Sequence, residues 1–235
     1  MVGLLGLLGL PEWVEPVARY MLDPGLTGTL RIAGVALVGS AVIGILLGTL
    51  LTIDFLPVRA PIRLYVEVWR GLPILVTVFI IYFALPAIGP TFQFDAFTSA
   101  SIGLTLWGSA QVAEATRGAV GSIPREQHEA SAALGFGWVG RHRYVILPQA
   151  LRRLLPPFVS LLVNIIQNTT IAQVIGAAEL LEAGERSVER LTFTSLTTGD
   201  FDSHALEIYG AVAAVFFLIS FPLTRLASYL ERRLV

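Results

Sequence analysis

The sequence of 235 residues contains no cysteine and no lysine, because all 16 of its basic residues are arginines. The lack of cysteine excludes disulfide bonds, thiolate metal sites and a cysteine nucleophile. The lack of lysine excludes a Walker A loop, whose lysine contacts the β- and γ-phosphates of ATP. If ATP drives this protein, another polypeptide must therefore hydrolyse it.

Charged residues are scarce as well: they make up 14% of the chain, whereas 54% of its residues are hydrophobic. With a mean hydropathy of +0.72, the chain is too apolar for a soluble domain of this length. The three histidines, His128, His142 and His204, do not group as metal ligands, and no nucleophile–base pair stands out. We therefore expect no catalytic residue, no metal, no cofactor held by this chain and no nucleic-acid partner.

Five apolar segments approach the length of about 20 residues with which a helix crosses the hydrocarbon of a bilayer. They are residues 31–53, 74–88, 100–115, 158–175 and 206–226. Several are short, so adjoining polar residues must extend them. The pattern predicts an all-α membrane protein of about five transmembrane helices, with residues 27–233 as the membrane domain. Residues 1–26 are expected to form an external or interfacial segment, since the apolar first ten residues are too few to span.

The positions of the arginines predict the orientation, because cytoplasmic loops are enriched in basic residues. One set of loops holds Arg59, Arg63, Arg70, Arg117, Arg125, Arg141, Arg143, Arg152, Arg153, Arg225, Arg232 and Arg233. The opposite side is acidic, with Glu179, Glu182, Glu185 and Glu189 at helical spacing. We therefore predict the N-terminus outside and the C-terminus inside. The acidic face is either merely solvated or the place where an external protein docks.

Small residues recur every four positions in the first apolar segment, at Ala36, Ser40, Gly44 and Gly48. Such a stripe allows another helix to approach closely. We interpret it as helix packing within the subunit, and a seam between two subunits is the alternative.

An arginine-rich insert, about residues 122–148, separates the third and fourth apolar segments on the inner side. Residues 125–134 are good helix formers, and Gly135 and Gly137 are expected to end that helix. A second helical stretch, 138–146, is expected to end before Pro148. The apolar side chains of this insert lie among charged ones, which suits docking into a groove of a soluble protein. An amphipathic loop lying on anionic lipid is the alternative.

The insert resembles a known motif. Glu129-Ala130-Ser131, then Gly135, then Val145-Ile146-Leu147-Pro148 is similar to the EAA loop of bacterial ABC importer permeases. The resemblance implies a type I importer fold and a cytoplasmic coupling helix that docks into an ATPase subunit. The residues that it assigns to this coupling are Glu126, Glu129, Ala130, Ala133, Leu134, Gly135 and Phe136.

Three further segments are similar to the polar amino acid subfamily, whose members carry histidine, glutamine, arginine or glutamate: residues 69–73, 113–118 and 174–181. This resemblance implies a permease in the bacterial cell membrane. It also implies two ATPase subunits, a second permease subunit, identical or homologous, and an external amino-acid-binding protein. The chain departs from the subfamily pattern at Gln111 and at residues 167–170, so the substrate contacts of relatives do not transfer there.

Polar residues inside a membrane are costly unless they are paired or face water. Asn164, Gln167 and Asn168 share one face of the fourth segment, and Glu114 lies one turn from Arg117, which favours an ion pair. The candidates for a translocation pathway are Gln111, Glu114, Asn164, Gln167, Asn168 and Thr169. The alternative is that these groups only join helices, where such bonds contribute about 0.6 kcal/mol on average.

The sequence thus favours the permease subunit of an ATP-driven importer for polar amino acids. Two other functions stay open. One alternative is an importer permease for another small solute. The other is a membrane scaffold or sensor that holds a cytoplasmic partner without transporting anything.

Overall fold

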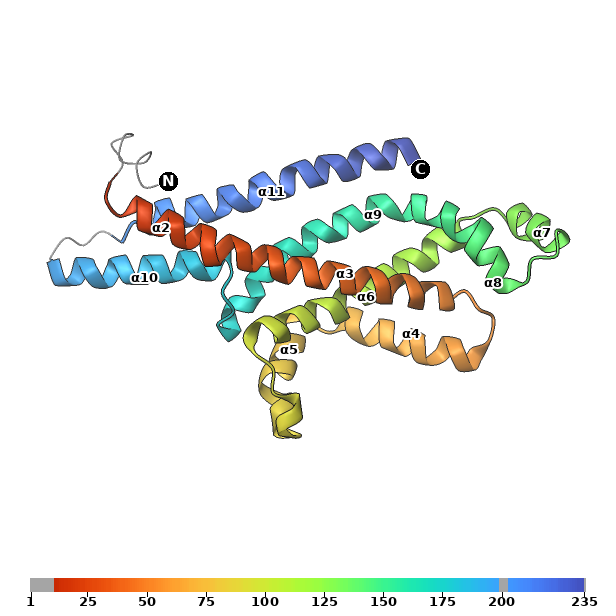
Figure 1. Ribbon diagram of the computed structural model, residues 1–235, viewed down its shortest axis with the longest axis horizontal. Helices are drawn as coiled ribbons and strands as arrows, with labels where there is room; N and C mark the ends of the chain where they lie inside the picture. Colours follow the sequence, from red (N-terminus) through yellow and green to blue (C-terminus); the bar gives the residue numbers. More distant parts are fainter. Residues whose placement is uncertain (1–10, 199–202, 235) are drawn as a thin grey trace.

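The computed structural model describes residues 11–198 and 203–234, and this part of the chain is almost entirely helical (Figure 1). The α-helices are α2 (Val14–Tyr20), α3 (Thr27–Leu50), α4 (Leu56–Gly71), α5 (Ile74–Phe79), α6 (Ala96–Gly121), α7 (Arg125–Ala133), α8 (Trp138–Arg141), α9 (Leu147–Asn168), α10 (Leu180–Thr198) and α11 (Ala205–Leu234). Tighter or wider helical turns extend several of them: Met21–Leu26, Ile80–Ala84, Leu85–Ala87, Pro90–Phe92, His142–Ile146 and Thr169–Ile175. The expectation for the first ten residues lies outside the described part.

Within the described residues, three helices are long and apolar enough to cross a membrane: Val14–Leu50, Trp138–Ile175 and Ala205–Leu234. A fourth candidate is a bent pair, Leu56–Gly71 with Ile74–Ala87, whose two parts meet at 104°. The described residues therefore form an all-α membrane protein with three to four candidate spans. The bend follows from the sequence, because Pro73 forces the preceding Leu72 out of the helical region into an extended conformation.

Helix α6 covers the expected third span, yet its composition is not apolar enough to mark it as one of these candidates. The helix carries polar residues along its length, and many of them are buried, including Ser99, Ser109 and Thr116. It packs against α3, α4, α5 and α9. A helix that its neighbours shield on most sides needs little apolar surface of its own, so α6 forms the centre of the bundle.

The small-residue stripe lies at the contact between α3 and α6. Ala36, Ser40, Gly44 and Gly48 are all buried. A side chain at Gly44 would overlap Val112, and one at Gly48 would overlap the backbone of Ala113. The interpretation of the stripe as packing within the subunit is confirmed.

The other end of α3 meets the start of α10, at a contact that we name the outer junction (Gly28, Thr29, Ala178, Glu179 and Leu180). A side chain at Gly28 would overlap the carbonyl oxygen of Ala178, so the two backbones touch. The backbone N–H of Leu180 donates to the Thr29 hydroxyl at 3.0 Å. The fully buried Glu179 carboxylate accepts from the backbone N–H groups of Leu181 and Glu182, which caps α10 at its N-terminus.

The acidic run of the outer side is therefore only partly a solvated face. Glu179 and Glu182 are buried, and Glu182 forms an ion pair with Arg186. Glu185 and Glu189 are exposed. Helical spacing placed the four carboxylates together correctly, but half of them are used to hold α10 against α3 and to pair with an arginine.

Candidate functional site

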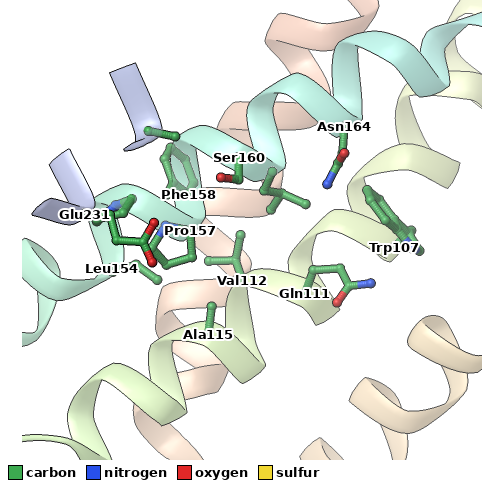
Figure 2. Close-up of a pocket in the computed structure, with 13 residues that line it drawn as sticks. Trp107, Gln111, Val112, Ala115, Leu154, Pro157, Phe158, Ser160, Asn164 and Glu231 are labelled. Atoms are coloured by element: carbon green, nitrogen blue, oxygen red, sulfur yellow. The ribbon is translucent and has the colours of Figure 1, made fainter. Parts of the chain in front are cut away.

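A cavity of about 480 Å³ lies between α6, α9 and α11 (Figure 2). Gln111 of α6 and Asn164 of α9 border it, beside the ring of Trp107, and Glu231 of α11 lies on its other side. The remaining wall is apolar except for Ser160 and includes Phe158. Its size falls within the range of small-molecule pockets, and an apolar wall with a few polar groups is typical of them. Two of the six pathway candidates are thus brought to one opening.

A charged network lies on the neighbouring surface, between α4 and α6. Glu114 is bonded to Arg117 by two contacts of 2.5 and 3.1 Å, which confirms the expected ion pair. Arg63 of α4 reaches the same carboxylate at 3.4 Å. Arg70 donates to the side-chain oxygen of Gln111 at 3.2 Å. A second arginine of α4 thus bonds the residue that borders the cavity, beside the ion pairs of Glu114.

The other three pathway candidates do not line this cavity. Gln167 is exposed, and Asn168 is half-buried and donates to the Asn164 carbonyl at 2.7 Å. Thr169 is fully buried, and its hydroxyl bonds the Ile166 carbonyl at 2.8 Å. Asn164 and Gln167 share an exposed face of α9, as their spacing predicted.

The arginine-rich insert forms the end of the molecule opposite α10 (Figure 1). Helix α7 ends at Ala133, and Gly135 follows two residues later with a φ of +83°, which is readily available only to glycine. The N–H of Phe136 bonds the Ser131 carbonyl at 3.1 Å, and the N–H of Gly135 bonds the Ala132 carbonyl at 2.9 Å. This pair of bonds is a Schellman motif. It turns the chain sharply, so that α7 is presented at the tip.

The residues assigned to coupling are largely accessible. Glu126, Glu129, Ala130, Ala133, Leu134 and Gly135 are exposed, and Phe136 is partly buried. Leu134 is 78% exposed and Val139 is 70% exposed. Apolar side chains with this exposure, set among glutamates, form a surface that suits a protein partner.

The second helix of the insert does not end before Pro148, so that expectation was wrong. The helix continues from Trp138 to Ile175. A wider, π-type turn over His142–Ile146 precedes Pro148, which lies in the first turn of α9. Proline is tolerated in a first turn. The insert is consequently continuous with the span that carries Asn164.

Some residues of the site were missed because their contacts join distant parts of the chain. Arg63 meets Glu114 across 51 positions, and Arg70 meets Gln111 across 41. Trp107 and Glu231 reach the cavity from different helices. A polar residue in an apolar segment was the available signal, and it marked Gln111 and Glu114 but not Arg63 and Arg70, their partners on α4.

Comparison with known proteins gives a consistent result. Residues 24–235 match the family described as "Binding-protein-dependent transport system inner membrane component". The glutamine transport system permease protein GlnP of Escherichia coli K12 is 39% identical over 214 residues, which cover 91% of this chain and 93% of that protein. The probable amino-acid ABC transporter permease protein YckA of Bacillus subtilis is 36% identical over 74% of this chain and 77% of its own length.

Solved structures agree. An amino acid ABC transporter crystallised with histidines aligns with a TM-score of 0.77 and 26% identity, covering 95% of this chain and 99% of that one. A chain of the MetNI methionine transporter aligns with a TM-score of 0.72 at 17% identity, which supports the fold alone.

The matches confirm the resemblance that the EAA-like insert carries. They identify a multi-pass ABC permease of the inner membrane, a transport subunit rather than an enzyme, which works with an ATPase and a binding protein. The chain belongs to the family of inner membrane components of binding-protein-dependent transport systems.

Proposed function

We propose that this chain is the permease subunit of an ATP-driven importer for polar amino acids, with glutamine as the first substrate to test. The observation that carries the proposal is the 39% identity to a glutamine permease over 91% of the chain. The cavity supports it, because the amides of Gln111 and Asn164 border an opening of about 480 Å³. Neutral amides donate and accept hydrogen bonds and so suit an amino acid's polar groups.

In the proposed topology the chain crosses the membrane five times, with the N-terminus outside and the C-terminus inside. Residues 1–26 form the external or interfacial segment, and residues 27–233 form the membrane domain. Helix α6 is the third span, and the bent pair of α4 and α5 contributes the second. The distribution of the arginines supports this orientation. So does the structure's separation of the arginine-rich insert from the acidic α10 (Figure 1).

The insert, about residues 122–148, is the proposed coupling loop. One of two ATPase subunits docks on the surface made by Glu126, Glu129, Ala130, Ala133, Leu134, Gly135 and Phe136. Docking drives transport only if the ATPase binds the outward-facing and inward-facing states with different affinity. The cofactor ATP and its Mg²⁺ belong to that partner, and we propose none for this chain.

A second permease subunit, identical or homologous, completes the pathway. We assign Gln111, Glu114 and Asn164 to its lining, and the exposed Gln167 and half-buried Asn168 to the side that faces the other subunit. Thr169 is buried and does not itself line the pathway, and its bond to the Ile166 carbonyl stabilises the helix turn next to Asn168. The binding protein delivers substrate at the end formed by α2 and α10.

The test is uptake by the complete complex in proteoliposomes, with a panel of radiolabelled amino acids supplied through the binding protein. We expect one or more polar amino acids to accumulate only when ATP is present. Failure of every amino acid, together with accumulation of another solute, would refute the substrate assignment. If the complex transports no solute at all, the alternative hypothesis of a membrane scaffold or sensor is favoured instead.

The coupling surface is tested by Glu129→Lys. We expect uptake to fall by about tenfold or more, the factor that corresponds to 1.4 kcal/mol at a docking residue, while the protein still inserts and folds. Asp54→Lys is the matched control, since Asp54 lies on the same side, has a side chain that is 98% exposed and is outside the loop. Equal uptake by both variants would contradict the docking assignment.

A further inference from the structure

His142 is one of the few buried polar side chains at the inner end of the molecule, with 6% of its surface exposed. It lies directly after α8, where the insert turns into the span formed by α9. Its ring stacks on Trp138 with centroids 4.1 Å apart and lies 6.4 Å from the ring of His128 on α7. One side chain therefore contacts both short helices of the proposed coupling loop.

The same side chain reaches α3. Nε2 of His142 lies 3.3 Å from the hydroxyl oxygen of Thr52, which is 90 positions away and two residues beyond the C-terminal end of α3. Nδ1 lies 3.0 Å from the carbonyl oxygen of Trp138. We name the contact of His142, Trp138 and Thr52 the inner junction. Helix α9 is joined to the loop by the chain itself, whereas α3 is joined to it by side chains.

The hydrogen positions at this junction are constrained. Nδ1 faces a carbonyl, so it carries a proton and donates. The Thr52 hydroxyl has one proton, and the hydroxyl oxygen lies 2.6 Å from the carbonyl oxygen of Thr49. That proton bonds either to the Thr49 carbonyl or, after rotation of the hydroxyl, to Nε2 of a neutral His142. The contact can thus open without leaving the hydroxyl unpaired.

We propose that His142 is a positioning residue that transmits movement of α7 and α8 to the inner end of α3, and that its bond to Thr52 forms and breaks during transport. The inference rests on the proposed function, because it needs an ATPase that moves the loop. Rotation of one hydroxyl between two acceptors makes the bond reversible. A permanent apolar contact would hold α3 and the loop together in every state.

The experiment compares variants of the complete complex in proteoliposomes by the ATP hydrolysed for each molecule of labelled glutamine taken up. Thr52→Val removes the hydroxyl, and His142→Phe keeps an aromatic ring on Trp138 while removing both nitrogens. We expect each variant to raise the ratio of ATP to glutamine by about fivefold, as the loss of one buried hydrogen bond shifts a two-state equilibrium. The double variant is expected to match the single ones.

Two controls separate this role from a merely structural one. Thr52→Ser keeps the hydroxyl and is expected to retain the wild-type ratio. Thr49→Val removes a neighbouring hydroxyl that bonds only its own helix, at the Ile45 carbonyl, and is also expected to retain it. If His142→Phe assembles poorly, the three threonine variants decide the question.

An unchanged ratio in Thr52→Val would overturn the proposal, and so would effects of Thr52→Val and His142→Phe that multiply in the double variant. These results differ from failure of the proposed function. In that case the wild-type complex itself transports no amino acid, whereas failure of the junction leaves the wild type and Thr52→Val equally active.

Discussion

Helix α3 packs closely against α6 as far as Gly48, but beyond that contact its two ends are attached in different ways, to α10 at the outer end and to the insert at the inner end. At the outer junction, backbone meets backbone: Gly28 leaves no room for a side chain beside Ala178, and Leu180 donates its N–H to Thr29. At the inner junction, side chain meets side chain, over 3.3 Å between His142 and Thr52. A side-chain contact is released by rotation about one bond, whereas a backbone contact is released only when helices separate.

This difference assigns separate roles to the two ends. The outer junction fixes α3 to α10, where a buried carboxylate and close backbone contact leave little freedom. The inner junction leaves the exposed α7 and α8 able to move relative to α3. Substitutions at the outer end are therefore expected to change stability first, and substitutions at the inner end to change coupling first.

The strongest test of this comparison is Gly28→Ala. A methyl group there would overlap the Ala178 carbonyl oxygen, so α3 and α10 must separate. We expect a loss of about 3 kcal/mol of stability, the upper part of the usual range for overpacking, measured as a lower melting temperature in detergent. Gly34→Ala is the matched control on the same helix, because nothing lies within 4 Å of the added methyl group. Equal melting temperatures of the two variants would refute the account of the outer junction.

A second test uses pH. Burial raises the pKa of Glu179 from 4.5 to about 6, although the N–H groups of Leu181 and Glu182 lower it and the nearby Glu182 charge raises it further. The folded state thus holds a proton that the unfolded state releases near pH 4.5. The resulting stabilisation is complete below that pH and is lost as the pH rises through about 6. A shift of this size corresponds to about 2 kcal/mol.

The measurement is the melting temperature of the wild type and of Glu179→Gln from below pH 4.5 to above pH 6. Glutamine does not titrate, so the difference between the two proteins isolates this carboxyl from all other titrating groups. We expect the difference to change across the interval in favour of the glutamine variant at the higher pH. A constant difference would contradict the burial of an ionisable Glu179.

The sequence predicted the helices better than the contacts between them. Four of the five expected apolar segments largely coincide with the candidate spans. The spacing of Gly44 and Gly48 predicted a close contact with another helix, which the structure identifies as α6. Spacing along one helix does not reveal which neighbour covers it. For this reason the burial of Glu179 could not be predicted. The bend at Leu72 has its cause in Pro73, but the apolar runs alone did not mark it.

The candidate site shows the same limit. The sequence predicted that the helix containing Glu129 ends near Gly135, since a glycine at a helix end implies a sharp turn. It also predicted that the apolar side chains there, set among charged ones, are available to a partner. The contacts of Arg63 with Glu114 and of His142 with Thr52 join residues that are far apart in sequence. Each side chain was visible, but nothing in the sequence paired them.

The smallest expected effect on stability is that of a substitution at Gly135, in the insert at the inner end. This position separates an effect on coupling from an effect on stability most clearly. Gly135 has a φ of +83°, and alanine pays about 1 kcal/mol or slightly more in that conformation. Gly137 is two residues away with a φ of −65° and no atom within 4 Å of an added methyl group, so Gly137→Ala is the matched control.

We expect Gly135→Ala to lower the melting temperature less than Gly28→Ala does, yet to reduce ATP-dependent uptake, whereas Gly137→Ala leaves uptake near the wild-type level. The reason is that strain at Gly135 re-aims α7, which contacts few other parts of the described chain, so the bundle stays folded while the docking surface is displaced. If Gly28→Ala and Gly135→Ala instead reduce uptake only in proportion to their loss of stability, the two ends of α3 do not have the separate roles inferred here.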